Sequence, residues 1–226
     1  MLVIADQQTL GIGGQGGLAG AGQTEEDSGV LAVQVGAYYF SPQKAFGSDG
    51  GLWIAVLSPA AIDRAYGIAK SVSLPGARRW IPPFLSLTSA IENSRKDQTL
   101  NTPAVATLVM LENQVRWLND NGGLAWATAR CARSASLLYQ WAERSDYAQP
   151  FVSDENARSN AVVTIDLDES INASQVVAAL RENGIMDTNG YRKLGRNQLR
   201  LGVFPSVEPS DVEALTKCVD YVAEHL

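Results

Sequence analysis

The sequence predicts an α/β protein with a small α+β region in its C-terminal part. Short apolar segments with the composition of buried strands alternate with longer segments in which apolar residues recur at helical spacing. Capping residues and prolines precede the helical segments, and glycines follow them. The chain has 226 residues, of which 46% are hydrophobic, so it can bury a sizeable core in one large domain or two small ones.

The composition excludes several classes of function. With 24 acidic and 18 basic residues, the chain has no positive field that would attract nucleic acid or an anionic membrane. Its one histidine, His225, leaves too little material for a zinc site or a histidine-based catalytic triad. Cys131 and Cys218 occupy apolar positions of predicted helices, which indicates buried thiols. The sequence shows neither a membrane-spanning apolar run nor a secretory signal, so a cytoplasmic location is expected.

The first segment, Leu2 to Ala5, has the composition of a short buried strand that ends at Asp6. A glycine-rich stretch from Gly11 to Gly29 follows and shows neither helical nor strand periodicity. Within it, Gly11 to Gly16 fits the G-x-G-x-x-G pattern of dinucleotide-binding loops. No amphipathic helix follows the match, so a low-complexity loop is the favoured interpretation and a dinucleotide-binding oxidoreductase is a weaker hypothesis.

Lys44 lies in a short loop between two apolar segments that are predicted to form strands. The first runs from Val30 to Phe40 with a break at Gly36, and the second runs from Leu52 to Leu57. Ser41-Pro42 precedes the lysine and glycines follow it, so tight turns are expected to hold its side chain. A lysine held in this way can be partly desolvated, which would free its lone pair to attack a carbonyl carbon. The residues alone favour the alternative, a solvated loop lysine.

Two helices are predicted after this loop. Ser58 can cap the first, the proline that follows it fits the first turn, and the apolar period continues to about Lys70. Residues 71–86 contain three prolines and are expected to be irregular. Asn101-Thr102-Pro103 has the composition of a helix start, with a capping side chain before a proline at the first helical position. The second helix is predicted to end at Asn121-Gly122-Gly123.

The C-terminal part of the sequence alternates helical and strand patterns in an order typical of a small α+β domain. A long amphipathic helix is expected first, from about Leu124 to Arg144. The predicted segments that follow it are a strand (161–167), a helix (174–183), a strand (198–204) and a final helix (210–224).

Four cations lie close together between the last two helices: Arg192, Lys193, Arg196 and Arg200. In a protein of negative net charge they form either a solvated rim or a local anion site. Planar guanidinium groups bind carboxylates and phosphates through paired N–H donors, which is the chemistry that an anion site requires. The residues alone favour the solvated rim.

Four stretches of the sequence resemble one family, in the order in which that family has them. They are Tyr38 to Trp53, which contains Lys44; Leu100 to Pro103; Asn121 to Leu124; and Tyr191 to Arg200. The family is the phosphoserine aminotransferases, in the form found in actinobacteria, which are class V, fold type I transaminases that depend on pyridoxal phosphate (PLP). The resemblance covers roughly residues 30–226.

This resemblance implies an α/β fold of known type. Residues 1–98 would form part of the large PLP-binding domain, and residues 99–226 would form the linking helices and the small α+β C-terminal domain. The chain would then correspond to the C-terminal part of a fold type I transferase without the N-terminal half of the large domain. A parallel sheet that lacks its earlier strands would expose an edge and an apolar face.

The resemblance also implies which residues bind the cofactor. Lys44 matches the catalytic lysine that binds PLP covalently. Asp6 resembles the aspartate that pairs with the pyridine nitrogen, although its spacing from Lys44 is wider than the spacing in the family. Asn101 and Thr102 match residues that reach the cofactor phosphate of the other subunit, which implies a homodimer.

Two of the four cations are assigned to the substrate by the same resemblance. Arg200 matches the arginine that holds the substrate α-carboxylate, and Arg192 matches one that contributes to the site for the substrate phosphate. Many family members have a histidine before the latter, where this chain has Tyr191. Lys193 and Arg196 match neither role and are expected to be solvated.

The implied reaction is amino transfer from L-glutamate to 3-phosphohydroxypyruvate, which yields O-phospho-L-serine and 2-oxoglutarate in serine biosynthesis. The implied cofactor is PLP, and the implied partners are these small molecules and a second copy of the chain. Because much of the family's binding site belongs to the missing half, an alternative stays open. The chain would then be a catalytically inactive, truncated remnant that acts only as an interaction or dimerisation module.

Overall fold

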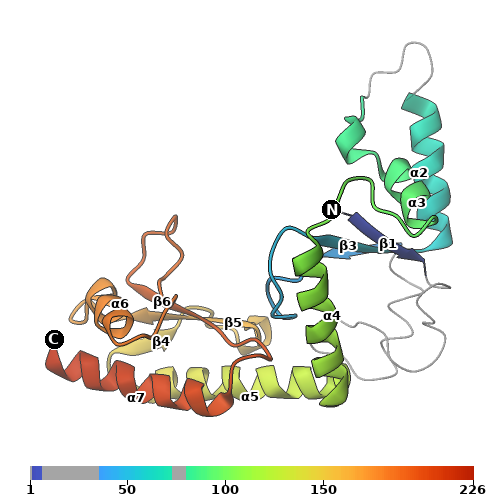
Figure 1. Cartoon of the computed structure of the whole chain (residues 1–226). Coiled ribbons are helices and arrows are strands. Elements are labelled where there is room, and N and C mark those ends of the chain that lie inside the picture. The colour runs from blue at the N-terminus through green and yellow to red at the C-terminus, as the bar shows by residue number, and fades with distance from the viewer. Residues whose placement is uncertain (1, 7–35, 73–79) are drawn as a thin grey trace. The chain divides into compact units, whose positions relative to one another are not determined.

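The computed structural model describes residues 2–6, 36–72 and 80–226. The chain divides into two compact units, Met1–Leu124 (unit 1) and Ala125–Leu226 (unit 2), and Figure 1 shows the elements of both. The domain boundary expected after residue 98 stays a prediction, because the two units are defined by compactness alone.

Unit 1 contains a three-stranded mixed sheet. Its strands are β1 (Leu2–Asp6), β2 (Ala37–Phe40) and β3 (Trp53–Leu57), in the spatial order β1-β3-β2. β1 runs parallel to β3, and β2 runs antiparallel to it. All three strands are predicted from the sequence. The predicted strand Val30 to Val35 and the glycine-rich stretch Gly11 to Gly29 lie outside the described residues.

Helix α2 (Pro59–Val72) confirms the predicted helix and its cap. The Ser58 hydroxyl accepts a hydrogen bond from the backbone N–H of Ala61 at 3.2 Å, which satisfies one of the free donors of the first turn. Ile62, one turn into the helix, is buried against the sheet of unit 1.

Helix α3 (Leu87–Ser94), which follows the 3-10 helix η1 (Pro83–Leu85), is not predicted from the sequence. Its eight residues are too few to establish a helical period. Ser86 caps it by accepting a hydrogen bond from the Ser89 N–H at 3.3 Å. Figure 1 shows α2 and α3 on the same side of the sheet. Residues of β3, α2 and α3 form a small buried core: Ala55, Leu57, Ile62, Ala90 and Ile91.

Helix α4 (Val105–Asp120) begins later than the sequence predicts. The cap position is Ala104, which makes no side-chain cap hydrogen bond, so the predicted start at Asn101-Thr102-Pro103 is wrong. The Thr99 hydroxyl donates to the backbone carbonyl of Asn101 at 2.6 Å, and such local bonds offer the backbone an alternative to the helix. The predicted end is confirmed, because α4 closes at Asn121.

Unit 2 is an α+β fold, as predicted, with an antiparallel sheet in the order β4-β5-β6. Strand β4 and the 3-10 helix η2 are not predicted, because elements of three residues are too short to show a period. In chain order the elements are α5 (Gly123–Arg144), β4 (Ala148–Pro150), η2 (Glu155–Ala157), β5 (Val162–Leu167), α6 (Ala173–Glu182), β6 (Gln198–Gly202) and α7 (Pro209–His225).

The two faces of the unit 2 sheet differ in chemistry, because successive side chains of a strand point to opposite faces. One face is apolar: Val163 and Ile165 are fully buried with side chains from α5, α6 and α7. The other face carries polar residues, since Asp166 of β5 is aligned with Gln198 of β6, and Arg200 lies two residues further along β6. The core therefore fills one side of the sheet and leaves the other side for polar contacts.

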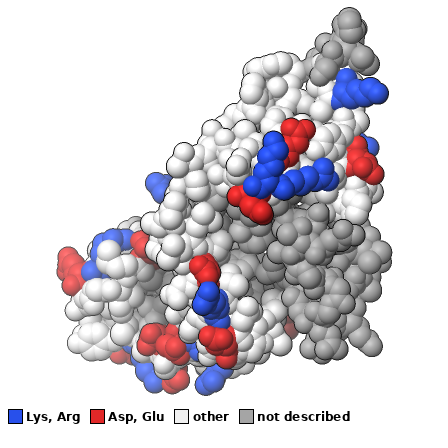
Figure 2. Space-filling view, turned by 45° about the vertical axis from the view of Figure 1, so that its right-hand side comes forward, with Lys and Arg blue, Asp and Glu red and all other residues white. Residues whose placement is uncertain are grey.

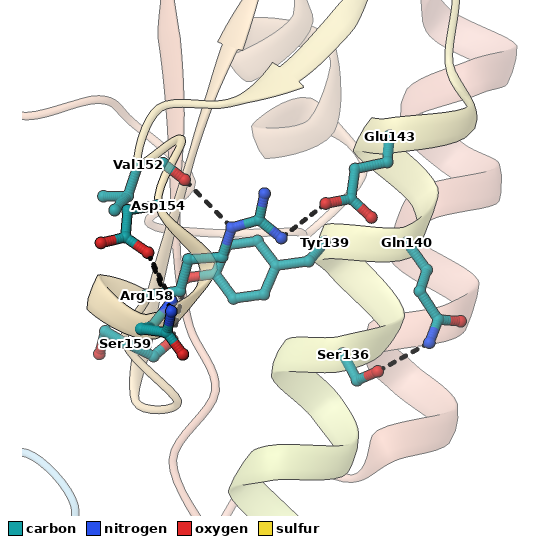
Figure 3. Close-up of polar contacts among 9 residues, drawn as sticks. Ser136, Tyr139, Gln140, Glu143, Val152, Asp154, Arg158 and Ser159 are labelled. Carbon is teal, nitrogen blue, oxygen red and sulfur yellow. Dashed lines mark hydrogen bonds and ion pairs between the residues drawn. The ribbon is translucent and has the colours of Figure 1, made fainter.

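Arg158 ties α5 to the connection between β4 and β5 (Figure 3). Its Nε donates to the Val152 carbonyl at 3.0 Å, and its Nη1 donates to Glu143 Oε1 at 2.6 Å. The guanidinium lies over the Tyr139 ring, 4.9 Å from its centroid, and the Tyr139 hydroxyl donates to the Ser159 carbonyl at 3.0 Å. Burial raises the pKa of Tyr139. These contacts hold the connection against the helix.

Cys131 on α5 is buried, as predicted, and Cys218 on α7 is half-buried. Burial raises the pKa of the Cys131 thiol, whereas the charge of Arg130 lowers it. Across the described ranges, no helix is both long enough and apolar enough to cross a bilayer.

Candidate active site

The loop that carries Lys44 joins β2 to β3 and is folded into tight turns, as the sequence predicts. The Lys44 carbonyl accepts a hydrogen bond from the Gly47 N–H at 2.8 Å, and the Pro42 carbonyl accepts one from the Ser48 N–H at 3.1 Å. Gly47 has a φ of 64°, a backbone conformation that favours glycine. The Ser41 hydroxyl donates at 2.6 Å to the carbonyl of the residue before β3 and so closes the base of the loop.

The side chain of Lys44 is exposed, although the turn beneath it is packed. Phe40 and Phe46 stack with their ring centroids 5.1 Å apart, and Pro42 is fully buried. The residues alone favour such a solvated lysine, and partial burial is not found within this single chain, because the adjacent residues of the loop are themselves exposed. A stiff turn therefore presents an accessible amine.

Asp6, the last residue of β1, lies at the opposite end of the unit 1 sheet from the Lys44 loop. Asp6 is aligned with Leu57, the last residue of β3, whereas Phe40, which precedes the loop, is aligned with Ile54. Three residues of extended strand separate these positions, or about 10 Å at the usual rise per residue. Strand pairing thus does not bring Asp6 to Lys44, and the role expected of Asp6 stays a prediction.

Asn101 and Thr102 are exposed residues of the segment between α3 and α4. Because α4 begins at Val105, the free N–H groups of its first turn belong to residues that follow Asn101 and Thr102 in the chain. A phosphate bound by Asn101 and Thr102 would therefore be held by these residues themselves and not by a helix cap. Their role at the cofactor of another subunit stays a prediction.

Arg192 and Arg200 both belong to unit 2. Arg200, on the polar face of β6, is half-buried and lies over the ring of Tyr191, 5.8 Å from its centroid. Its backbone N–H donates to the Thr188 carbonyl at 3.1 Å. Arg192 is exposed and lies in a turn. The Leu194 N–H donates to the Tyr191 carbonyl at 2.8 Å and closes this turn. Among the described residues neither arginine forms an ion pair, so both charges are open to an anion.

Arg196 is exposed, as expected, but it is also paired with a carboxylate, which the sequence does not predict. Its Nε donates to Asp166 Oδ1 at 3.2 Å and its Nη2 to Asp166 Oδ2 at 2.6 Å. The hydrogen bond and charge of Asp166 raise the pKa of the Arg196 guanidinium. Asp166 precedes Arg196 by 30 residues, and only the alignment of β5 with β6 brings the two together. Lys193 is also exposed, as expected.

Asn197 organises the entry into β6 and is not singled out by the sequence. Its Oδ1 accepts a hydrogen bond from the Ala173 N–H at 2.8 Å. Its Nδ2 lies 3.1 Å from the Leu167 carbonyl, 3.0 Å from that of Asp168 and 2.8 Å from that of Ile171. An asparagine before a strand has no sequence pattern that distinguishes this role from a turn, so residue type alone could not have identified it.

Charges of both signs are interspersed on the face of the molecule shown in Figure 2. Among the described residues of that face, no broad area of one sign is seen. The net charge of −6 likewise provides no long-range attraction for anions. Anion binding must therefore depend on local groups such as Arg192 and Arg200. In the described part of the chain, no cluster of three His, Cys, Asp or Glu side chains could hold a metal ion.

Comparison with known proteins finds relatives of high sequence identity. No family model matches the chain. Curated relatives share 55–58% identity with it. One is the phosphoserine aminotransferase of Rhodococcus opacus (strain B4), which is 56% identical over 202 residues; the match covers 88% of this chain and 52% of the relative. The chain thus spans about half the length of the curated relatives that it matches.

Solved structures show the same fold. A phosphoserine aminotransferase from Cytophaga hutchinsonii matches with a TM-score of 0.73 and 20% identity, over 84% of this chain and 50% of that chain. A PLP-bound phosphoserine aminotransferase from Trichomonas vaginalis matches with a TM-score of 0.65 and 15% identity, over 96% of this chain and 53% of that chain. These matches confirm the predicted fold of a PLP-dependent aminotransferase. The chain is therefore homologous to the phosphoserine aminotransferases, as its motifs predict, over a stretch of about half their length.

Proposed function

We propose that this chain supplies the cofactor lysine and the substrate arginines of a PLP-dependent phosphoserine aminotransferase. One observation carries the proposal: Lys44 presents an accessible amine on a stiff turn between two strands, in a chain 55–58% identical to its curated relatives. The proposed reaction transfers the amino group of L-glutamate to 3-phosphohydroxypyruvate. Its products are 2-oxoglutarate and O-phospho-L-serine.

The residues around Lys44 fit PLP in part. The amine is exposed, and covalent attachment of a cofactor requires such access. The nearby Ser48 hydroxyl is buried and has no hydrogen-bond partner among the described residues, so the loop keeps one unsatisfied polar atom. Asp6, at the other end of the sheet, is proposed as the partner of the ring nitrogen on the family resemblance alone.

The role proposed for Lys44 is proton transfer. When bound, PLP supplies an electron sink for the electron pair left on the substrate Cα after its proton is removed. The Lys44 Nζ, once the substrate amine has replaced it, is the base that takes this proton. Backbone hydrogen bonds fix the turn from which that side chain extends, and a base that is held in position lowers the entropic part of the barrier.

Arg200 and Arg192 are proposed to bind the two ends of the substrate. Arg200 is half-buried on a strand, and its planar guanidinium can orient the α-carboxylate through two N–H donors. Arg192 is exposed in the neighbouring turn and can bind the phosphate. Tyr191, at a position where many family members have a histidine, packs its ring against Arg200. In this chain that residue therefore supports the carboxylate site.

The assembly proposed is a homodimer located in the cytoplasm. Asn101 and Thr102 are exposed and can reach a second copy of the chain, where they would contact the cofactor phosphate. The alternative, a remnant that acts only as an interaction module, is not favoured by the comparisons. The pattern Gly11 to Gly16, on which the weaker hypothesis of dinucleotide binding rests, lies outside the described ranges.

Covalent trapping tests the proposal. The purified chain is incubated with PLP and reduced with borohydride, and the modified lysine is located by mass spectrometry. We expect attachment at Lys44 and its loss in Lys44→Ala. Lys70→Ala, which removes another exposed lysine of unit 1, is the matched control and should retain the modification. Equal labelling of several lysines, unchanged in Lys44→Ala, would contradict the proposal and support the inactive module.

A further inference from the structure

Asp166 is a buried residue, and both of its carboxylate oxygens accept hydrogen bonds. Its exposed fraction is 8%, and its neighbour Gln198 is 2% exposed. Oδ2 accepts from Arg196 Nη2 at 2.6 Å, and Oδ1 accepts from Arg196 Nε at 3.2 Å and from Gln198 Nε2 at 2.8 Å. A guanidinium bound through two nitrogens has a fixed plane as well as a fixed position. Because Asp166 neutralises it, Arg196 is a poor ligand for a second anion.

Phe151 holds the same guanidinium from another side. The Arg196 guanidinium carbon lies 4.9 Å from the centroid of the Phe151 ring. Phe151 follows β4, and its backbone N–H donates to the Thr164 carbonyl at 3.1 Å, so the ring is itself attached to the sheet. Arg196 is thus fixed by a carboxylate of β5 and an aromatic ring beside β4, although half of its side chain is open to solvent.

The segment that contains Arg196 is attached to the sheet at both ends, to β6 at its start and to β5 at its end. At its start, Asn189 pairs with Leu199 in an isolated bridge. At its end, the Leu167 N–H donates to the Asn197 carbonyl at 2.9 Å. Between these ends Gly195 has a φ of 64°, a turn conformation that glycine adopts at little cost. Arg196 adds a side-chain attachment to the sheet next to this turn.

Arg196 also differs in ion pairing from the two arginines that flank it. Arg192 and Arg200 form no ion pair among the described residues, whereas Arg196 is neutralised. Tyr191, on the same segment as Arg196, contacts the Arg200 guanidinium. Movement of the segment would therefore change the position of Arg192 and the packing of Arg200 together.

We propose that Arg196 is a positioning residue and not an anion ligand. Paired with Asp166, it holds the segment that carries Tyr191 and Arg192 beside Arg200. The inference rests on the proposed function, because it assigns the two unpaired arginines to a ligand with both a carboxylate and a phosphate. Two anionic groups on one small molecule require cations at a fixed separation, and the Arg196–Asp166 pair maintains that separation.

The test uses the full chain and O-phospho-L-serine as the probe. Arg196→Ala and Asp166→Asn should each weaken binding of the probe about tenfold, measured by calorimetry. The double variant should bind no more weakly than either single variant, because both substitutions break one pair. Arg196→Lys, which keeps the charge but not the planar two-nitrogen contact, should recover part of the affinity.

Lys193→Ala is the matched control, since it removes one positive charge from the same segment without removing a contact to Asp166. Its affinity for the probe should stay within about twofold of the unsubstituted chain. A second readout needs no ligand: because the Arg200 guanidinium lies over the Tyr191 ring, the NMR signal of the Arg200 Nε–H should depend on the position of that ring. Arg196→Ala should move this signal toward its position in Tyr191→Ala, whereas Lys193→Ala should not.

The outcomes separate the two proposals. If Arg196→Ala is folded by circular dichroism and leaves both the affinity and the Arg200 signal unchanged, Arg196 is not a positioning residue. An equal loss of affinity in Lys193→Ala would also overturn the inference, since it would show an effect of charge alone. If the unsubstituted chain does not bind O-phospho-L-serine, the proposed substrate site fails, while the Arg200 signal still decides whether Arg196 positions the segment.

Discussion

Unit 2 encloses its apolar side chains more completely than the described part of unit 1. In unit 2, Leu138 and Ile165 have no exposed surface, and the core draws on three helices and the sheet. In unit 1, Tyr39 and Phe84 are each 76% exposed and Trp80 is 78% exposed. Large apolar groups left in water contribute little to folding. We therefore expect unit 2 to be the more stable unit and unit 1 to open more readily.

The same contrast applies to the proposed site. Lys44 in unit 1 is exposed on a turn whose own residues are largely exposed. The arginines of unit 2 are supported by side chains that the unit itself supplies, since Tyr191 packs on Arg200 and Asp166 holds Arg196. A site supported by neighbouring side chains is arranged before its ligand binds. Unit 2 thus brings its own positioning contacts, and unit 1 contributes a reactive group on a stiff turn.

The largest effect is expected from the core of unit 2. Leu138→Ala removes a fully buried side chain and should lower the free energy of unfolding by about 2–5 kcal/mol, because it leaves a cavity. Hydrogen exchange should show faster exchange throughout the helices of unit 2. Ile62→Ala, in the smaller core of unit 1, should cost less. An equal or larger cost for Ile62→Ala would show that the two units do not differ in this way.

A smaller loss is expected when a shared acceptor in unit 2 is removed. Asp220 Oδ1 accepts from Trp141 Nε1 at 2.8 Å and from the Tyr147 hydroxyl at 2.6 Å. Asp220→Ala leaves both donors without this acceptor and should cost about 1–3 kcal/mol in denaturant unfolding. Asp220→Asn, which keeps an oxygen at the same position, is the control and should cost less. Equal losses would mean that charge, not hydrogen bonding, stabilises this cluster.

Removing one helix cap in each unit tests whether the two units differ in stability. Ser86→Ala removes the cap of α3, and Asn172→Ala removes the cap of α6, where the Asn172 side chain accepts from the Ser174 N–H at 2.9 Å. Each should cost about 1 kcal/mol. Hydrogen exchange should show that α3 loses its protection, while α6 stays protected by its packing in the larger core. Equal loss of protection would contradict the difference between the units.

The smallest effect is expected from a change of pH. Only the first part of the titration of the Tyr147 hydroxyl falls in a pH range in which unfolding can be measured. Burial, and then the hydrogen bond to Asp220, raise the pKa of Tyr147 above that of an unfolded tyrosine, about 10. The folded unit therefore favours the neutral phenol, and the stability it contributes is present below about pH 10 and is lost as the pH rises above that value. Denaturant unfolding at about pH 9 and about pH 10.5 should show this loss.

Tyr147→Phe is the control for the pH prediction, since phenylalanine keeps the ring and removes the ionisable hydroxyl. The variant should lose less stability over the same pH interval, although Tyr139, whose pKa is also raised by burial, still titrates. Identical losses in the variant and the unsubstituted chain would show that Tyr147 does not contribute.

Much of the proposed site is visible in the sequence because it depends on local chemistry. The turn at Lys44 follows from Ser41-Pro42 and the glycines after it, and the structure confirms that turn. Arg192 and Arg200 are assigned by the resemblance of their segment to the family, because the residues alone favour a solvated rim. The partner of Arg196 could not be found in this way, because Asp166 lies on a different strand. The solvated Lys44 that the residues alone favour agrees with its exposed side chain in the structure.

The sequence by itself determined the helices and strands with strong local signals. The cap at Ser58 and the long apolar period of α5 are examples, because caps and periods act within one or two turns. Only the tertiary structure decided that α4 begins at Val105, that Asp6 and Lys44 lie at opposite ends of one sheet, and that Asp166 neutralises Arg196. These features depend on packing and on contacts between residues far apart in the chain, and residue type alone does not specify such contacts.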